Sequence, residues 1–200
     1  MRLPLLLSLL ALVDAASAQP RVPDGGAVIE GGDSVEGCVW RYLTTARLDG
    51  RATPTTSGRV IRTVEPNRRI DANDRSSSWT VVRRPGRLRA ARALTLSGVQ
   101  RFGTQSTIRR GAEPSGSVTL RVPAGGTVEY LMDTGEGYGY FRYGGSVYHG
   151  DGLYDGSWTT LSEPVTELWL RLVARDRRPA AWVEVSRGAR ALDCDGAAEW

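Results

Sequence analysis

Apolar residues occur along this chain in short runs rich in valine and aromatic side chains, each bounded by Gly, Pro, Asn, Asp or Ser. Such runs are typical of β-strands, because β-branched and aromatic side chains fit a pleated surface and the bounding residues favour turns. Many short strands at regular turn spacing predict an all-β fold, either a sandwich or small barrels. The predicted strands are Val39 to Leu43, Val60 to Val64, Trp79 to Arg83, Val118 to Val122, Thr127 to Met132, Gly139 to Tyr143, Leu168 to Val173 and Ala181 to Val185.

One stretch, Arg87 to Leu96, departs from this pattern because its arginine and alanine content favours a helix. Pro85 and Gly86 open the stretch, and no long apolar face develops along it. The pattern therefore predicts at most one or two helical turns there.

The N-terminus has the layout of a cleavable secretory signal. Arg2 precedes an apolar run from Leu3 to Val13, and small residues at Ala16 and Ala18 predict cleavage after Ala18. The run is too short for a membrane span, which needs about 20 apolar residues, and no later segment approaches that length. We therefore expect residues 1–18 to be removed and the mature protein to be periplasmic or secreted, with no membrane span.

The segment that follows, residues 19–36, is rich in Gly, Pro and Asp. Its apolar residues follow neither the helical period nor the alternation of a strand, which predicts a flexible lead-in. Folding is expected to begin near Cys38, one of the two cysteines in the chain. In an oxidising compartment Cys38 and Cys194 are expected to form a disulfide, which closes a long loop and stabilises the fold by roughly 5 kcal/mol. Two free thiols, or a bridge between chains, are the alternatives.

The formal net charge is +4, and every basic side chain is arginine. The arginines suit either a solvated face or the recognition of an anionic polymer through their bidentate forks. Nucleic acid is not expected as a partner, because an exported protein rarely meets it. A monomer is expected. The arginines cluster at Arg83, Arg84, Arg87, Arg89 and Arg92, and again at Arg59, Arg62, Arg68 and Arg69.

A family resemblance begins at Leu48. The segment Leu48-Asp49-Gly50-Arg51-Ala52-Thr53-Pro54-Thr55-Thr56-Ser57-Gly58-Arg59-Val60-Ile61 resembles the opening of a bacterial SH3-like domain, and the likeness continues through Glu65-Pro66-Asn67 to Trp79 and Val82. The usual closing Gly-Trp-Val strand is absent, since Pro85-Gly86 is followed by Leu88 and Ala90. The resemblance implies a first SH3-like module over residues 37–96.

A second, looser copy resembles the same family. Trp169-Leu170-Arg171-Leu172, an arginine-rich turn and Ala181-Trp182-Val183 are similar to the family's ending, with Ala181 in place of the expected Gly. The resemblance implies two small SH3-like barrels, the second over residues 125–200, joined by a connector over residues 97–124. It also implies binding of a cell-wall glycopeptide or an envelope protein. No cofactor is expected.

Aromatic and glycine residues alternate between Tyr138 and Trp158, a combination that suits both a recognition surface and strand packing. On the SH3-like alignment this stretch is a long loop of the second barrel. The expected binding residues are Tyr138, Tyr143, Tyr154, Arg142 and His149. The alternative is that the large aromatic residues are core, and Tyr140, Tyr148, Trp158, Trp169 and Trp182 are the expected core members.

The inventory of catalytic residues is thin. His149 is the only histidine, and two cysteines with one histidine lack the spacing of a zinc site. Without lysine there is no phosphate-binding loop that ends in Lys. We therefore expect no metal and no enzyme activity. The alternative is an envelope hydrolase or inhibitor that uses the carboxylates Asp151, Asp155, Glu163 and Glu167, and a weaker alternative is calcium binding by Asp133, Glu136, Asp151 and Asp155.

Overall fold

The computed structural model describes residues 19–31, 34–35, 38–39, 41–153 and 155–192. Strands dominate this part of the chain, and its one helical element is the short 3-10 turn η2, Ala72–Asp74. The predicted all-β fold is therefore confirmed, and each of the eight predicted strands overlaps an observed one. None of the described residues forms a helix long and apolar enough to cross a bilayer.

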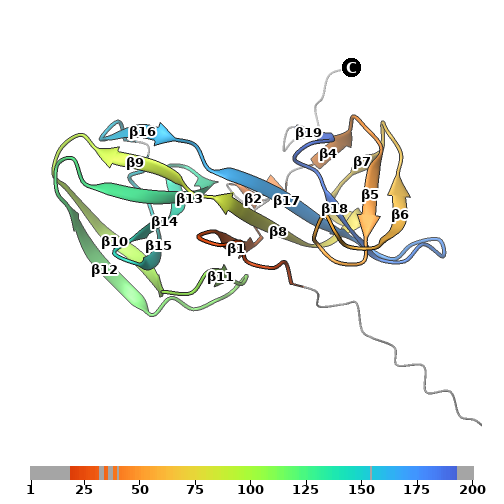
Figure 1. Cartoon of the computed structure of the whole chain (residues 1–200), viewed down its shortest axis with the longest axis horizontal. Coiled ribbons are helices and arrows are strands. Elements are labelled where there is room, and N and C mark those ends of the chain that lie inside the picture. Colours follow the sequence, from red (N-terminus) through yellow and green to blue (C-terminus); the bar gives the residue numbers. More distant parts are fainter. Residues whose placement is uncertain (1–18, 32–33, 36–37, 40, 154, 193–200) are drawn as a thin grey trace, which may run out of the picture.

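Two long strands, β8 (Arg75–Arg84) and β17 (Val165–Leu172), pair in antiparallel fashion along nearly their whole length and join two lobes (Figure 1). Side chains of β8 are buried on both faces of the sheet, with Val82 in one hydrophobic cluster and Trp79 and Val81 in another. A strand covered on both faces reads as a continuous apolar run, which explains the sequence Trp79 to Val82.

The first lobe is built around a sheet of seven described strands in the order β11-β1-β8-β17-β18-β5-β6. A smaller sheet, β19-β4-β7, closes this lobe, so that Leu170 and Val183 of the large sheet pack with Tyr42 and Ile70 of the small one. The further bounds are β1 (Ala27–Glu30), β4 (Arg41–Thr44), β5 (Leu48–Arg51), β6 (Val60–Val64), β7 (Arg69–Ile70), β11 (Thr107–Ile108), β18 (Ala181–Glu184) and β19 (Ala189–Leu192), and a short pair is formed by β2 (Ser34–Val35) and β3 (Cys38–Val39).

The second lobe is a curved sheet of seven described strands in the order β12-β10-β15-β14-β13-β9-β16. Its concave interior is filled by a cluster that includes Val99, Phe141 and Tyr148. The bounds are β9 (Gly86–Ala90), β10 (Leu94–Gly103), β12 (Gly116–Val122), β13 (Thr127–Gly135), β14 (Tyr138–Tyr143), β15 (Ser146–Gly150) and β16 (Trp158–Ser162). All of these strands lie between β8 and β17 in the sequence, so the second lobe is an insertion into the first.

The two ends of this insertion meet, because β9 pairs with β16 just beyond the β8–β17 pair. Pro85 and Pro164 stand at the junction and have no amide hydrogen to donate, so the ladder is interrupted there. The backbone passes close by at Gly86, where a Cβ atom would lie 2.7 Å from the carbonyl oxygen of Ser162. The β8–β17 pair of the first lobe thus continues, after a break at the two prolines, as the β9–β16 pair of the inserted lobe.

This topology corrects the expected division into modules at 37–96 and 125–200. Strand β18, assigned to the second copy, pairs with β5 of the first copy, where Trp182 lies opposite Arg51. The expected connector, residues 97–124, holds β11, β12 and most of β10. The strands that resemble the start and the end of one family domain therefore lie in the same sheet, a non-local arrangement that linear alignment does not reveal.

The expected flexible lead-in over residues 19–36 is also corrected. Strand β1 lies between β8 and β11, and Ala27, Val28 and Ile29 are buried. Three successive apolar residues showed no alternation because both faces of this strand are covered. The Gly and Pro residues before it form a turn, in which the amide of Gly26 donates to the carbonyl oxygen of Pro23 at 2.9 Å.

The predicted helical turns at Arg87 to Leu96 are wrong as well. This stretch forms β9 and the start of β10, and Leu88 and Ala90 are buried while Arg87 and Arg89 are exposed. Buried and exposed residues alternate with a period of two. This pattern outweighs the helix propensity of arginine and alanine, so the stretch forms strands.

Two further predictions fall outside the described residues. The signal sequence, residues 1–18, lies there, and so do Cys194 and the side chain of Cys38. The cleavage after Ala18 and the disulfide therefore stay predictions.

A buried carboxylate forms an ion pair between the two central strands, β8 and β17. Glu167 of β17 is only 5% exposed and accepts hydrogen bonds from Nη2 of Arg83 at 2.8 Å and from Nε1 of Trp169 at 3.2 Å. Burial alone would raise the pKa of Glu167, but the hydrogen bonds from Arg83 and Trp169 and the charge of Arg83 outweigh it, so the pKa lies below its ordinary value of 4.5. The charged carboxylate therefore stabilises the fold.

We expect Glu167→Gln to lower the free energy of unfolding at neutral pH by about 1 to 3 kcal/mol, because charged hydrogen bonds are lost in a buried site. Since the pKa is lowered in the folded state, the contribution of Glu167 is present above pH 4.5 and is lost as the pH falls below it. Urea unfolding from pH 7 to pH 3 measures this. The exposed Glu163→Gln is the matched control and should follow the parent protein. Parallel pH profiles for the Glu167 variant and the parent would contradict the assignment.

Candidate functional site

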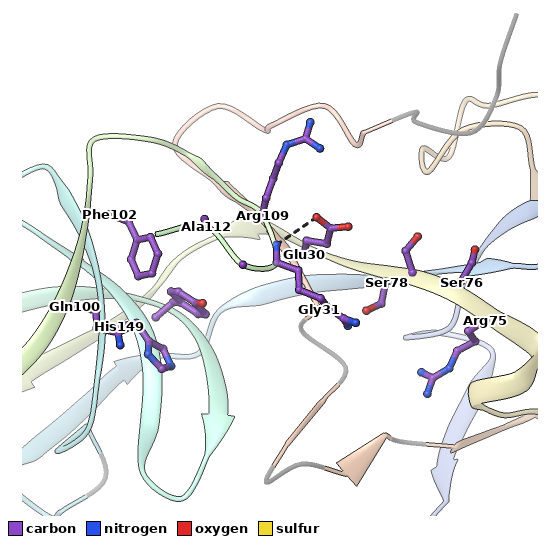
Figure 2. Close-up of a pocket in the computed structure, with 14 residues that line it drawn as sticks. Glu30, Gly31, Arg75, Ser76, Ser78, Gln100, Phe102, Arg109, Ala112 and His149 are labelled. Atoms are coloured by element: carbon purple, nitrogen blue, oxygen red, sulfur yellow. Dashed lines mark hydrogen bonds between the residues drawn. The ribbon is translucent and has the colours of Figure 1, made fainter. Parts of the chain in front are cut away.

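A cleft of about 570 Å³ lies where the first sheet meets the inserted lobe. Figure 2 shows its two walls, one formed by the inserted lobe and the other running along β8, with Glu30 and Gly31 between them. The labelled residues on the first wall are Gln100, Phe102 and His149, and those along β8 are Arg75, Ser76 and Ser78.

The first wall is a row of side chains across three neighbouring strands. Tyr140 of β14 and Gln100 of β10 are both register partners of His149 in β15, so the three side chains lie side by side on one face. The ring centroids of Tyr140 and His149 are 4.6 Å apart, and those of Tyr140 and Phe102 are 5.8 Å apart. This wall offers flat rings beside an amide, a surface suited to a ligand with both apolar and hydroxylated faces.

His149 is half-buried in the middle of this row. Its Nε2 lies 3.0 Å from Oγ1 of Thr134, and its ring also stacks on Tyr138 at a centroid distance of 5.9 Å. Burial lowers the pKa of His149 below its ordinary value of 6.5, so the ring is neutral at pH 7. Nδ1 makes no hydrogen bond to any described residue and remains able to bond to a ligand.

The second wall is polar and carries positive charge. Ser76 and Arg75 stand on β8, where Ser76 Oγ accepts a hydrogen bond from Nη1 of Arg171 at 3.1 Å. The guanidinium of Arg75 lies over the ring of Tyr42, 5.9 Å from its centroid. Three arginines, Arg75, Arg109 and Arg110, line the cleft, whereas Glu30 is the one carboxylate among its described lining residues. The charge of the cleft therefore favours an anionic group.

The expected binding residues are only partly brought together. Tyr138 is 42% exposed and lies on the cleft side of β14, where it stacks on His149. Tyr143 lies on the opposite face, half-buried against the core of the inserted lobe, and Tyr154 lies outside the described residues. His149 is thus the one predicted residue that lines the cleft.

Arg142 has a structural role. It forms an ion pair with Glu129 at 2.6 Å, and it donates hydrogen bonds to the carbonyl oxygens of Gly25 and Gly26 at 3.1 and 3.0 Å. These contacts fasten the turn before β1 to the inserted lobe. The guanidinium of Arg142 therefore bonds to groups within the protein, and Arg142 is not among the residues that line the cleft.

The aromatic stretch is a hairpin and not the long loop implied by the family resemblance. Strands β14 and β15 are joined by Gly144 and Gly145, which have φ angles of 54° and 80°. Two successive positive φ angles give the tight turn whose twist matches antiparallel strands, and glycine adopts them without strain. The alternation of the stretch sends Phe141 and Tyr148 inward, where they are buried, and Tyr138 and Tyr140 outward. Trp169 and Trp182 are buried, as predicted.

Two of the four carboxylates proposed for hydrolysis are engaged in contacts within the protein. Glu167 is buried in its ion pair with Arg83, and Asp155 accepts a hydrogen bond from the amide of Ser157 at 2.9 Å. No group of three His, Cys, Asp or Glu side chains in the described ranges is placed to hold a metal ion.

Sequence reasoning missed most of the cleft. Arg75, Gln100 and Arg110 come from separate segments, and only the folding of β8 against the inserted lobe brings them together. The one local signal was the pair Arg109-Arg110 before Gly111, a basic dipeptide at a turn.

No protein-family model matches the chain, and no curated protein or solved structure is significantly similar to it.

We predict that the ring of His149 titrates below pH 6.5, because burial disfavours the charged ring. Since the unfolded chain binds the proton first, the stability of the protein falls as the pH falls through 6.5, and His149→Ala removes this part of the pH dependence. His149 is the only histidine, so a ¹⁵N NMR titration of the untagged protein reports on it alone. A ring pKa at or above 6.5 would contradict the burial.

Proposed function

We propose that this protein is an exported, non-enzymatic binding protein whose cleft holds a cell-envelope ligand, with peptidoglycan as the favoured partner. The observation that carries the proposal is the pairing of two different walls. His149 and Tyr140 offer rings on one side, while arginine and serine side chains of β8 face them across a cavity of about 570 Å³. A cavity of this volume with a few convergent polar groups is typical of a ligand site.

The chemistry of peptidoglycan matches both walls. Its sugar rings present apolar faces that stack on aromatic side chains and hydroxyl groups that bond to amides and hydroxyls. Its carboxylates suit the arginines of the cleft. The export signal predicted at residues 1–18 and the resemblance to SH3-like domains, which implied an envelope ligand, support the same partner.

A hydrolase is the second candidate, and one contact favours it. The Thr134 hydroxyl lies 3.0 Å from Nε2 of His149, the arrangement of a nucleophile and its base. Such a pair needs a third group to orient the ring, and no described carboxylate contacts Nδ1 of His149. Binding without catalysis is therefore the proposal favoured here.

The test is retention of the mature protein on purified cell-wall sacculi. We expect His149→Ala to lower the affinity roughly five- to tenfold, because a ring contact contributes about 1 kcal/mol or slightly more. Tyr143→Ala is the matched control, since it removes a ring from the opposite face of the same hairpin, and thermal unfolding verifies that both variants fold. Equal retention of parent and His149 variant would contradict the cleft as the site. Release of soluble fragments, abolished by Thr134→Val, would instead support the hydrolase.

A further inference from the structure

Arg110 is placed at the cleft by a tight turn after β11. The amide of Ala112 donates to the carbonyl oxygen of Arg109 at 3.0 Å, and Gly111 has a φ angle of 73°. The backbone amide of Arg110 also donates to Oε2 of Glu30, at 3.3 Å. The turn is thereby tied to the C-terminal end of β1, and this contact fixes the backbone from which the side chain of Arg110 projects.

The guanidinium of Arg110 lies against the backbone of Gly31. A Cβ atom added to Gly31 would lie 3.0 Å from Nε and 3.1 Å from Nη2 of Arg110. Gly31 also has a φ angle of 84°, which a larger residue adopts only with strain. Glycine at position 31 is therefore favoured by its φ angle, and the absence of a Cβ atom leaves the guanidinium of Arg110 in its present position.

Arg110 differs from its neighbours in having no partner for its charge. Arg109 donates to Oε1 of Gln19 at 2.7 Å, and its guanidinium lies over the ring of Trp79. In the part of the chain that the structure describes, the guanidinium of Arg110 forms neither an ion pair nor a hydrogen bond. Figure 2 shows Arg109 directed away from the labelled residues of the cleft, which leaves the anion-binding role to its neighbour.

We propose that Arg110 binds the carboxylate of an acidic sugar whose ring lies against Tyr140 and His149; this inference rests on the proposed function of the cleft. The planar fork of arginine matches a planar carboxylate with two parallel hydrogen bonds. Glu30 lies beside the site, and its negative charge repels a doubly charged phosphate more strongly than a singly charged carboxylate. The aromatic row and Gln100 then receive the ring and its hydroxyl groups.

Two sugars test the charge directly. N-acetylmuramic acid carries a lactyl carboxylate on the ring that it shares with N-acetylglucosamine. Calorimetric or NMR titration of the full mature chain should show the acid binding at least about tenfold more tightly than the neutral sugar. Arg110→Gln, at an exposed position, should abolish this preference and leave the weak binding of N-acetylglucosamine unchanged.

A glycine pair tests the positioning of the guanidinium. Gly31→Ala should weaken binding of the acid because the new Cβ displaces Arg110. Gly125→Ala is the matched control, since Gly125 has a similar φ of 77° but nothing within 4 Å of its Cβ position. Both variants place a Cβ atom at a similar positive φ angle, so equal affinities for the acid would overturn the role of Gly31 and Arg110.

The outcomes separate this inference from the function on which it rests. Equal binding of the two sugars, or tighter binding of glucose 6-phosphate than of N-acetylmuramic acid, overturns the carboxylate site while sacculus binding through the cleft stands. Retention of the protein on sacculi, with no binding of either sugar, also overturns the carboxylate site. Loss of the sacculus interaction itself, with neither sugar bound, defeats the proposed function.

Discussion

The pairing of β8 with β17 is the constraint on which the rest of this structure depends. These strands contribute to the core of the first lobe at one end, where Leu170 and Leu172 are buried, and they lead into the inserted lobe at the other. Pro85 and Pro164 interrupt the ladder between the two halves, so β9 and β16 can diverge from the first sheet and curve into the second. The buried Glu167 and its partner Arg83 are tied across this same pair.

The cleft is a consequence of this arrangement. Where the first sheet packs against the inserted lobe, apolar side chains such as Ile29, Val82 and Phe102 form a shared core. Further along β8, beyond the buried Trp79 and Thr80, the sequence changes to Ser76-Ser77-Ser78, and these serines line the polar cleft. Serine side chains are too small and too polar to continue the packing, so a ligand-sized space remains.

The sequence allowed prediction of the local structure but not of the way the parts are combined. Strand β6 was predicted to the residue, because Val60 to Val64 is a β-branched run bounded by turn residues. Strand β1 was missed because its three buried residues lack alternation. The insertion was missed because the pairing of β18 with β5 links residues far apart in the chain, and no local pattern records such a contact.

In the candidate site, too, the features that depend on local sequence were predicted, and those that depend on contacts between distant segments were not. His149 was predicted from its place in an aromatic stretch, and it does line the cleft. Tyr143 lies on the face opposite the cleft, because its stretch is the strand that its own residues predict and not the long loop that the family resemblance implies. Arg110 and Gly31 had no signal beyond a basic dipeptide and a glycine, since their relation is a contact between two turns.

The central claim is that a ligand enters between the two walls, and backbone amide NMR shifts on addition of soluble peptidoglycan fragments test it most directly. We expect shifts on both sides at once, at Gly31 and Ser76 to Ser78 of the first lobe and at Gln100, Tyr140 and His149 of the inserted lobe. Shifts confined to one lobe, or to the hairpin turn at Gly144 and Gly145, would contradict it.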